Sequence, residues 1–186
     1  MNTLPHPDEY EIIQRCLDGD GDAYAVLVDR YQAMAYTAAS RMLGDADLAN
    51  DIAQESFIAA YGGLRQFGFR SKFSSWLMSI VLNKCRDHFR AVRETVSVDS
   101  IAEVRATGRR DPEQEASARE TTDAVQIALN RLPPAYREII ILKHIEELDY
   151  QEISDILGIG IPALKVRAYR GRELLRQALT GTGVER

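Results

Sequence analysis

Residues 150–179 read YQEISDILGIGIPALKVRAYRGRELLRQAL and predict two helices joined by a tight turn. Ile153 and Ile156 recur at helical spacing in the first helix. Gly158 follows, where a left-handed C-terminal cap favours glycine. Pro162 stands where a first helical turn tolerates a missing amide proton, so a second helix begins there. The stretch therefore predicts a helix-turn-helix.

The second helix has an apolar stripe and a basic face. At 100° per residue the inward stripe is Leu164, Ala168, Gly171 and Leu175. The opposite side carries Lys165, Val166, Tyr169, Arg170 and Glu173. Residues 161–179 hold five Lys or Arg and one Glu, a net charge of +4. Such a helix is typical of a major-groove reader, although a solvated amphipathic helix can carry the same charges.

The composition favours a cytoplasmic protein without a cofactor. A chain of 186 residues with 45% hydrophobic residues can bury one ordinary core or two small ones, and it has no apolar run long enough to span a bilayer. Its first ten residues lack the basic and apolar segments of an export signal. Cys16 and Cys85 lie far apart and only three histidines accompany them, so we expect no metal site and no disulfide scaffold.

The net charge of −5 hides basic blocks within an acidic chain. Residues 1–61 carry −8, residues 62–93 carry +6, and the 161–179 helix carries +4. Phosphate attraction acts over about a Debye length, roughly 8–10 Å, so local charge matters more than the total. The pattern suits a protein that contacts DNA at two places and offers acidic surface to another partner.

The remaining periodicity predicts an all-α chain of two small helical domains. The expected helices of the front domain (residues 8–93) are 8–17, 22–43, 46–66 and 73–93. The helical pattern resumes from Pro112, and the back domain (residues 116–180) includes a further helix over 135–145. Residues 94–115 have weak periodicity and mixed charge, which predicts a flexible linker. No segment alternates like a strand.

Two parts of the front domain predict binding surfaces. In the 46–66 helix we expect Ile52, Phe57 and Ile58 to point inward, whereas Asp51, Gln54 and Glu55 share a face that the core does not need. Aromatic and basic residues alternate through the loop 67–72 and into the next helix, as single-stranded nucleic acid requires. The glycine-flanked Phe67 and Phe69 favour base stacking, whereas Phe73, Trp76 and Phe89 fit either the core or a base.

Several motifs occur together in a fixed order. In the front domain they are LGD at 43–45, DIAQESFIAAY at 51–61 and FSSWL at 73–77; in the back domain they are LP at 132–133, YREII at 136–140, YQEI at 150–153, LGI at 157–159 and RGR at 170–172. With both sets in this order, the chain resembles a bacterial RNA polymerase sigma factor of the extracytoplasmic-function group. The front domain resembles sigma region 2, a helical bundle, and the back domain resembles the helix-turn-helix of region 4.

The resemblance implies specific partners for each surface. Residues expected to dock on core RNA polymerase are Asp51, Gln54 and Glu55. Residues expected at the melted minus-ten element are Phe67, Phe69, Arg70, Lys72, Phe73, Trp76, Asn83 and Arg86. Residues expected at the duplex minus-thirty-five element are Arg137, Lys165, Val166, Arg167, Tyr169 and Arg170. The function implied is promoter selection in a stress or environmental response, controlled by an anti-sigma factor that in this family is commonly membrane-anchored.

Two departures from the family pattern bear on promoter preference. Ile161-Pro162-Ala163 stands where a Gly-Thr start of the recognition helix is common, so a hydroxyl that could cap the helix or bond a phosphate is missing. Val166 replaces a frequent serine, which exchanges a hydrogen-bonding group for an apolar contact to a thymine methyl.

Two other classes of protein compete with this interpretation. A free-standing helix-turn-helix repressor would need a dimer face or a ligand pocket, whereas the front domain offers a basic aromatic loop and an acidic face. An enzyme is disfavoured, because the sequence has no glycine-rich phosphate loop, clustered metal ligands or nucleophile motif.

Overall fold

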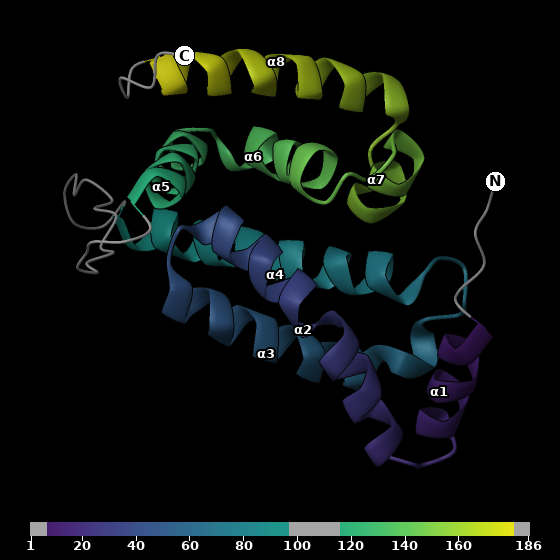
Figure 1. Ribbon diagram of the computed structural model, residues 1–186. Helices are drawn as coiled ribbons and strands as arrows, with labels where there is room; N and C mark the ends of the chain where they lie inside the picture. The colour runs from purple at the N-terminus through teal and green to yellow at the C-terminus, as the bar shows by residue number, and fades with distance from the viewer. Residues whose placement is uncertain (1–6, 97–115, 181–186) are drawn as a thin grey trace.

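The computed structural model describes residues 7–96 and 116–180 (Figure 1). The helices are α1 Pro7–Leu17, α2 Asp22–Leu43, α3 Ala46–Gly63, the 3-10 turn η1 Leu64–Gln66, α4 Phe73–Val96, α5 Ala116–Asn130, α6 Pro134–Ile140, the π-helical turn η2 Ile141–Ile145, α7 Tyr150–Leu157 and α8 Ile161–Thr180. These two ranges contain no strand, which confirms the all-α prediction. Helix α4 runs through the first three residues of the expected linker, 94–115, and residues 97–115 lie outside the described part of the chain.

Capping residues define several helix ends, among them the one that the sequence predicts at Gly158. Gly44 ends α2 with φ 72°, and the Asp45 carboxylate accepts hydrogen bonds from the first amides of α3. Asp149 and Glu152 form a reciprocal capping box at the start of α7. Gly158 ends α7 with φ 66°, a conformation that costs glycine little. Each cap contributes about 1 kcal/mol, so these short signals fix where the helices begin and end.

Two expected helices are interrupted. The 46–66 helix becomes a 3-10 turn after Gly63, and the 135–145 helix becomes π-helical after Ile140. In the second case the Glu146 amide donates to the Ile141 carbonyl, five residues back, and Glu147 then takes the left-handed φ of 54°. The wider turn changes the direction of the chain before α7.

Helices α2, α3 and α4 form the core of the front domain, with α1 against α2. Helices α2 and α3 bury several alanines, whose small side chains allow close helix packing; among them are Ala35, Ala38, Ala39, Ala49, Ala53 and Ala60. Helix α4 buries Leu77, Met78, Val81, Leu82 and Cys85. The sequence prediction placed Ile58 inside as well, but its side chain is 72% exposed.

The two domains pack against each other. Helix α4 lies against α7, and the end of α2 lies against α5 (Figure 1). One apolar cluster contains Val81 of the front domain together with Leu142 and Ile153 of the back domain. Where α2 ends, Gln126 of α5 bonds both to the Arg41 side chain and to its carbonyl oxygen. The described residues therefore form a closed arrangement rather than two separated domains.

Candidate nucleic-acid interface

Helix α8 presents the face that the sequence predicts. Leu164 and Ala168 are buried, and Lys165, Val166, Tyr169 and Arg170 are exposed on the opposite side, Val166 at 53% and Tyr169 at 62%. Figure 1 shows α8 on the outer side of α6, away from α2–α4. Two large apolar or aromatic side chains between two cations form a surface suited to base edges and phosphates.

Gly171 sets how closely α8 can lie on α6. It is buried, and a Cβ added there would lie 3.1 Å from Ile140 Cγ1 and 3.5 Å from the Tyr136 carbonyl oxygen. A side chain at this position would push the two helices apart. The glycine of the RGR motif therefore has a packing role, and the flanking Arg170 and Arg172 remain exposed.

Two lysines lie near the ring of Tyr150 at the start of the helix-turn-helix. Lys143 Nζ is 5.2 Å and Lys165 Nζ is 5.9 Å from its centroid. Cation–π attraction holds each ammonium group near the ring. Lys165 is thereby oriented before any ligand binds. Arg167, which the sequence predicts on the same DNA-binding face, is instead half-buried, and its positive charge lowers the pKa of Glu138 in α6 against the effect of burial.

The aromatic loop is mostly a core structure. Phe67 is 5% exposed and Phe73 is 0% exposed, and their ring centroids lie 5.9 Å apart. Trp76 packs 5.0 Å from Phe67. The prediction that Phe67 and Phe73 stack on bases is therefore corrected. Both rings fill the centre of the aromatic cluster, because each buries more apolar surface there than it would in a loop.

Two aromatic residues of the loop region keep partly exposed rings, Phe69 and Trp76. Phe69 has φ 54°, which is unusual for a residue with a side chain, and its ring lies 4.8 Å from that of Tyr10 in α1. Tertiary packing thus holds Phe69 at the surface in a strained backbone conformation. Among the predicted rings, these two are the ones to which a base has access.

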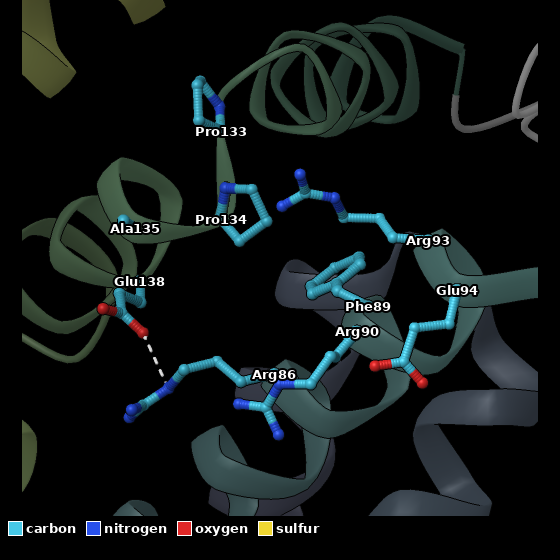
Figure 2. A pocket seen from close by; sticks show the side chains of 9 residues that line it. All are labelled: Arg86, Phe89, Arg90, Arg93, Glu94, Pro133, Pro134, Ala135 and Glu138. Carbon is cyan, nitrogen blue, oxygen red and sulfur yellow. Dashed lines mark ion pairs between the residues drawn. The ribbon is translucent and has the colours of Figure 1, made fainter. Parts of the chain in front are cut away.

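The polar residues expected at the minus-ten element divide into two groups. Arg70 and Asn83 are exposed. Lys72 and Arg86 instead pair with the back domain: Lys72 Nζ lies 2.8 Å from Glu152 Oε1, and Arg86 Nε lies 3.2 Å from Glu138 Oε2. Figure 2 shows the second pair at the edge of a cleft between α4 and the α5–α6 turn.

Arg137 does not lie on the DNA-facing surface of α8. It is 5% exposed, donates to the carbonyl oxygen of Met42 at the end of α2, and donates to those of Asn130 (2.7 Å) and Leu132 (3.1 Å). Helix ends leave such carbonyls without intrahelical donors, and the guanidinium supplies them. Burial lowers the pKa of Arg137 to about 10. Arg137 therefore links the two domains through these hydrogen bonds. The sequence had predicted a DNA contact for it instead.

The acidic face of α3 is exposed, as expected. Asp51, Gln54 and Glu55 all face solvent, and Glu55 Oε2 lies 2.9 Å from Lys84 Nζ. Ile58 continues this face one turn further along. Its exposure follows from the helical spacing, because Ile58 stands four residues after Gln54 and so shares the polar face of α3.

Beside this face, α2 and α3 form a shallow groove. Its apolar lining includes Val28, Tyr36, Phe57 and Ile58, and Tyr36 is 39% exposed. An exposed apolar groove next to carboxylates is typical of a protein-docking surface. Among the described residues there is no cluster of metal ligands, and none of their helices is long and apolar enough to cross a membrane.

Comparison with known proteins identifies both domains. Residues 27–95 match the family model of sigma-70 region 2, and residues 122–175 match that of sigma-70 region 4. The ECF RNA polymerase sigma factor SigW of Bacillus subtilis is 38% identical over 177 residues, covering 90% of this chain and 94% of SigW. The chain belongs to the extracytoplasmic-function (ECF) group of RNA polymerase sigma factors.

Other similar proteins agree with this assignment. RNA polymerase sigma factor NccH of Alcaligenes xylosoxydans is 36% identical over 187 residues, covering 98% of this chain and all of NccH. The structure of CnrH in complex with the cytosolic domain of CnrY matches with a TM-score of 0.67 at 27% identity, over 91% of this chain and 96% of CnrH.

As an ECF sigma factor, the chain is a specificity subunit for transcription initiation, and its partners are core RNA polymerase and promoter DNA. The acidic face, the groove and the aromatic loop lie within its region 2, and the exposed face of α8 lies within its region 4. The sequence resemblance to this group is thereby confirmed.

Proposed function

We propose that this ECF sigma factor docks on core RNA polymerase through the acidic face of α3 and reads two promoter elements with separate surfaces. Asp51, Gln54 and Glu55 supply charge for docking, and the neighbouring groove supplies apolar area. Exposed carboxylates steer and align a partner, whereas buried apolar anchors give most of the affinity. Ile58 and Tyr36 line this groove and are exposed, so we assign them as the apolar anchors.

At the minus-thirty-five element, the exposed face of α8 enters the major groove. Lys165 and Arg170 donate to guanine edges or phosphates, and Val166 and Tyr169 contact thymine methyl groups. This face is the observation that carries the proposal, because Val166 and Tyr169, exposed and flanked by cations on one side of a helix, suit both the base edges and the phosphates of a major groove. At the melted minus-ten element, Phe69 and Trp76 stack on unpaired bases while Arg70 and Asn83 contact the strand.

The chain performs no catalytic step in this proposal and acts on the polymerase in the cytoplasm. Its activity in a stress or environmental response is controlled by a protein inhibitor, an anti-sigma factor that is anchored in the membrane. Support comes from the similar structure of CnrH, which was solved with the cytosolic domain of CnrY bound.

Transcription with purified components tests the proposal. Core polymerase is incubated with genomic DNA of the source organism, with and without the chain, and the 5′ ends of the transcripts are sequenced. We expect a small set of new start sites that share two upstream elements. The variant Val166→Ser should change the preferred upstream element but not the fold, since Val166 is exposed. Start sites that are the same with and without the chain would refute the proposal.

A further inference from the structure

The cleft between α4 and the α5–α6 turn has a lining that the proposed function does not use. Its volume is about 690 Å³, which lies in the range of sites for small organic ligands. Helix α4 supplies one wall, and the α5–α6 turn with the start of α6 supplies the other (Figure 2). The side chains that these walls bring together include Arg86, Phe89, Arg90, Arg93, Pro134 and Glu138.

The α4 wall is strongly basic. Arg86, Arg90 and Arg93 are four and three residues apart, so helical spacing places them on one side of α4. Arg90 and Arg93 are exposed, and Arg90 Nη1 lies 2.8 Å from Asp87 Oδ1 in a surface pair that holds the guanidinium weakly. A guanidinium binds phosphate oxygens through two parallel hydrogen bonds. This wall is therefore suited to a phosphorylated ligand.

The Phe89 ring adds a flat apolar surface to the basic wall. It is half-buried, and the Arg137 guanidinium lies 5.5 Å from its centroid. Arg137 is 5% exposed and donates to the carbonyl oxygens of Asn130 and Leu132, so it holds the ring from the protein interior. The part of the ring that lines the cleft can stack on a planar base.

The opposite wall contains a buried acceptor. The Glu138 side chain is 5% exposed, and its Oε2 lies 3.2 Å from Arg86 Nε (Figure 2). Among the described side chains, both atoms are buried and neither makes a hydrogen bond. A buried polar atom without a hydrogen bond is costly. An N–H group of a ligand would satisfy Oε2, while the charge of Arg86 keeps the carboxylate in place.

The two walls also restrict the size of the ligand. Duplex DNA is read by an exposed helix face such as that of α8, whereas here the α5–α6 turn faces the arginines across the cleft. The lining fits a small molecule that has phosphates, a planar ring and an N–H donor on the ring edge. A purine nucleotide has all three.

We propose that this cleft binds a purine nucleoside diphosphate or triphosphate. Arg90 and Arg93 hold the phosphates, Phe89 stacks on the base, and Glu138 Oε2 accepts a hydrogen bond from the edge of the base. Arg86 is a positioning residue that orients Glu138. This ligand site goes beyond the proposed function and does not rest on it, because neither polymerase docking nor promoter reading uses the cleft.

Isothermal titration calorimetry on the full chain tests the proposal with defined probes. GDP and ADP carry both base and phosphates, pyrophosphate carries phosphates alone, and guanosine and adenosine carry the base alone. We expect one saturable site for at least one of the diphosphates. Pyrophosphate and the nucleosides should bind about tenfold more weakly or worse, because base stacking and guanidinium contacts each add affinity. Pyrophosphate that binds as tightly as GDP and ADP would overturn the site.

An arginine variant with a matched control tests the phosphate contact. Arg90→Gln should weaken binding of the diphosphate about tenfold and leave the fold intact, because the side chain is 68% exposed. Arg176→Gln is the control and should bind like the wild type. Arg176 is equally exposed, and it also pairs with a carboxylate three residues away, that of Glu173.

A ring variant tests the base contact. Phe89→Leu keeps an apolar side chain, so it should weaken the nucleoside diphosphate about tenfold and leave the affinity for pyrophosphate unchanged. A general loss of structure would lower both affinities. The melting temperature gives an independent readout, since a ligand that binds the folded chain stabilises it. The diphosphate should raise the melting temperature of the wild type and of Arg176→Gln more than that of Arg90→Gln.

Three results would overturn the nucleotide site. They are the lack of a saturable signal with both diphosphates, equal affinities of Arg90→Gln and Arg176→Gln, and equal loss of nucleotide and pyrophosphate in Phe89→Leu. If neither diphosphate binds but Arg90→Gln lowers the affinity of the holoenzyme for promoter DNA, the arginines contact the DNA backbone instead. Transcription by the wild-type chain is measured separately, so the sigma function stands or fails independently of these results.

Discussion

Arg137 offers a sharp test of the packing between the two domains. Substituting Arg137→Ala removes the donor to three carbonyl oxygens, those of Met42, Asn130 and Leu132. A hydrogen bond from a charged donor contributes about 1.5–3 kcal/mol, so three contribute roughly 5–9 kcal/mol. Burial lowers the pKa of Arg137 to about 10, which corresponds to a desolvation cost of roughly 3 kcal/mol that offsets part of this gain. The variant should therefore lower the free energy of unfolding by about 2–6 kcal/mol.

Urea unfolding measures this loss with two probes. Far-UV circular dichroism reports helices of both domains, and the fluorescence of Trp76, the single tryptophan, reports the front domain alone. Because one apolar cluster spans both domains, both midpoints should fall together. Arg170→Ala is the matched control, and as an exposed position it should change stability by no more than about 0.5 kcal/mol. An Arg137→Ala variant as stable as this control would refute the interdomain role of Arg137.

Three further predictions address docking, promoter reading and pH. Asp51→Arg and Ile58→Ser should each lower the affinity for core polymerase in a pull-down titration with no change in melting temperature, because both residues are exposed; an earlier melt would mean that the face is structural. Tyr169→Ala should lower transcription from minus-thirty-five-dependent promoters about tenfold, a loss of roughly 1–3 kcal/mol in recognition, whereas Gln177→Ala on the same helix should not. Burial raises the pKa of Glu138, so its neutral form is favoured in the folded state, and stability that is present at low pH is lost as pH rises through the raised pKa. As pH rises above the ordinary glutamate pKa of 4.5, the wild type should thus lose more stability than Glu138→Gln, and equal losses in urea titrations would contradict the assignment.

Local signals in the sequence predicted most of the secondary structure. The bounds of α2, the cap at Gly158 and the inward stripe of α8 all follow from patterns within a few residues. Such patterns are reliable because helix periodicity and capping chemistry act over one or two turns. The exposed face of α8 was predictable for the same reason.

The features that the sequence did not predict depend on distant contacts. Arg137 resembles a surface arginine in its own helix, and only its bond to Met42, 95 residues away, makes it an interdomain residue. Phe67 resembles an exposed loop residue until Phe73 and Trp76 pack around it. Tertiary burial overrides local propensity at these positions, and no short pattern encodes it.

Permanganate footprinting of promoter opening tests the central claim most directly. The probe is a promoter found by mapping transcripts, incubated with core polymerase alone, with the chain alone, and with both together. We predict that thymines from the minus-ten element to the start site become reactive only when both are present. Phe69→Ala should weaken the reaction, since Phe69 is one of the two rings predicted at the minus-ten element that the described structure leaves partly exposed. Opening by core polymerase without the chain, or tight sequence-specific binding of duplex DNA by the chain alone without opening, would contradict the account.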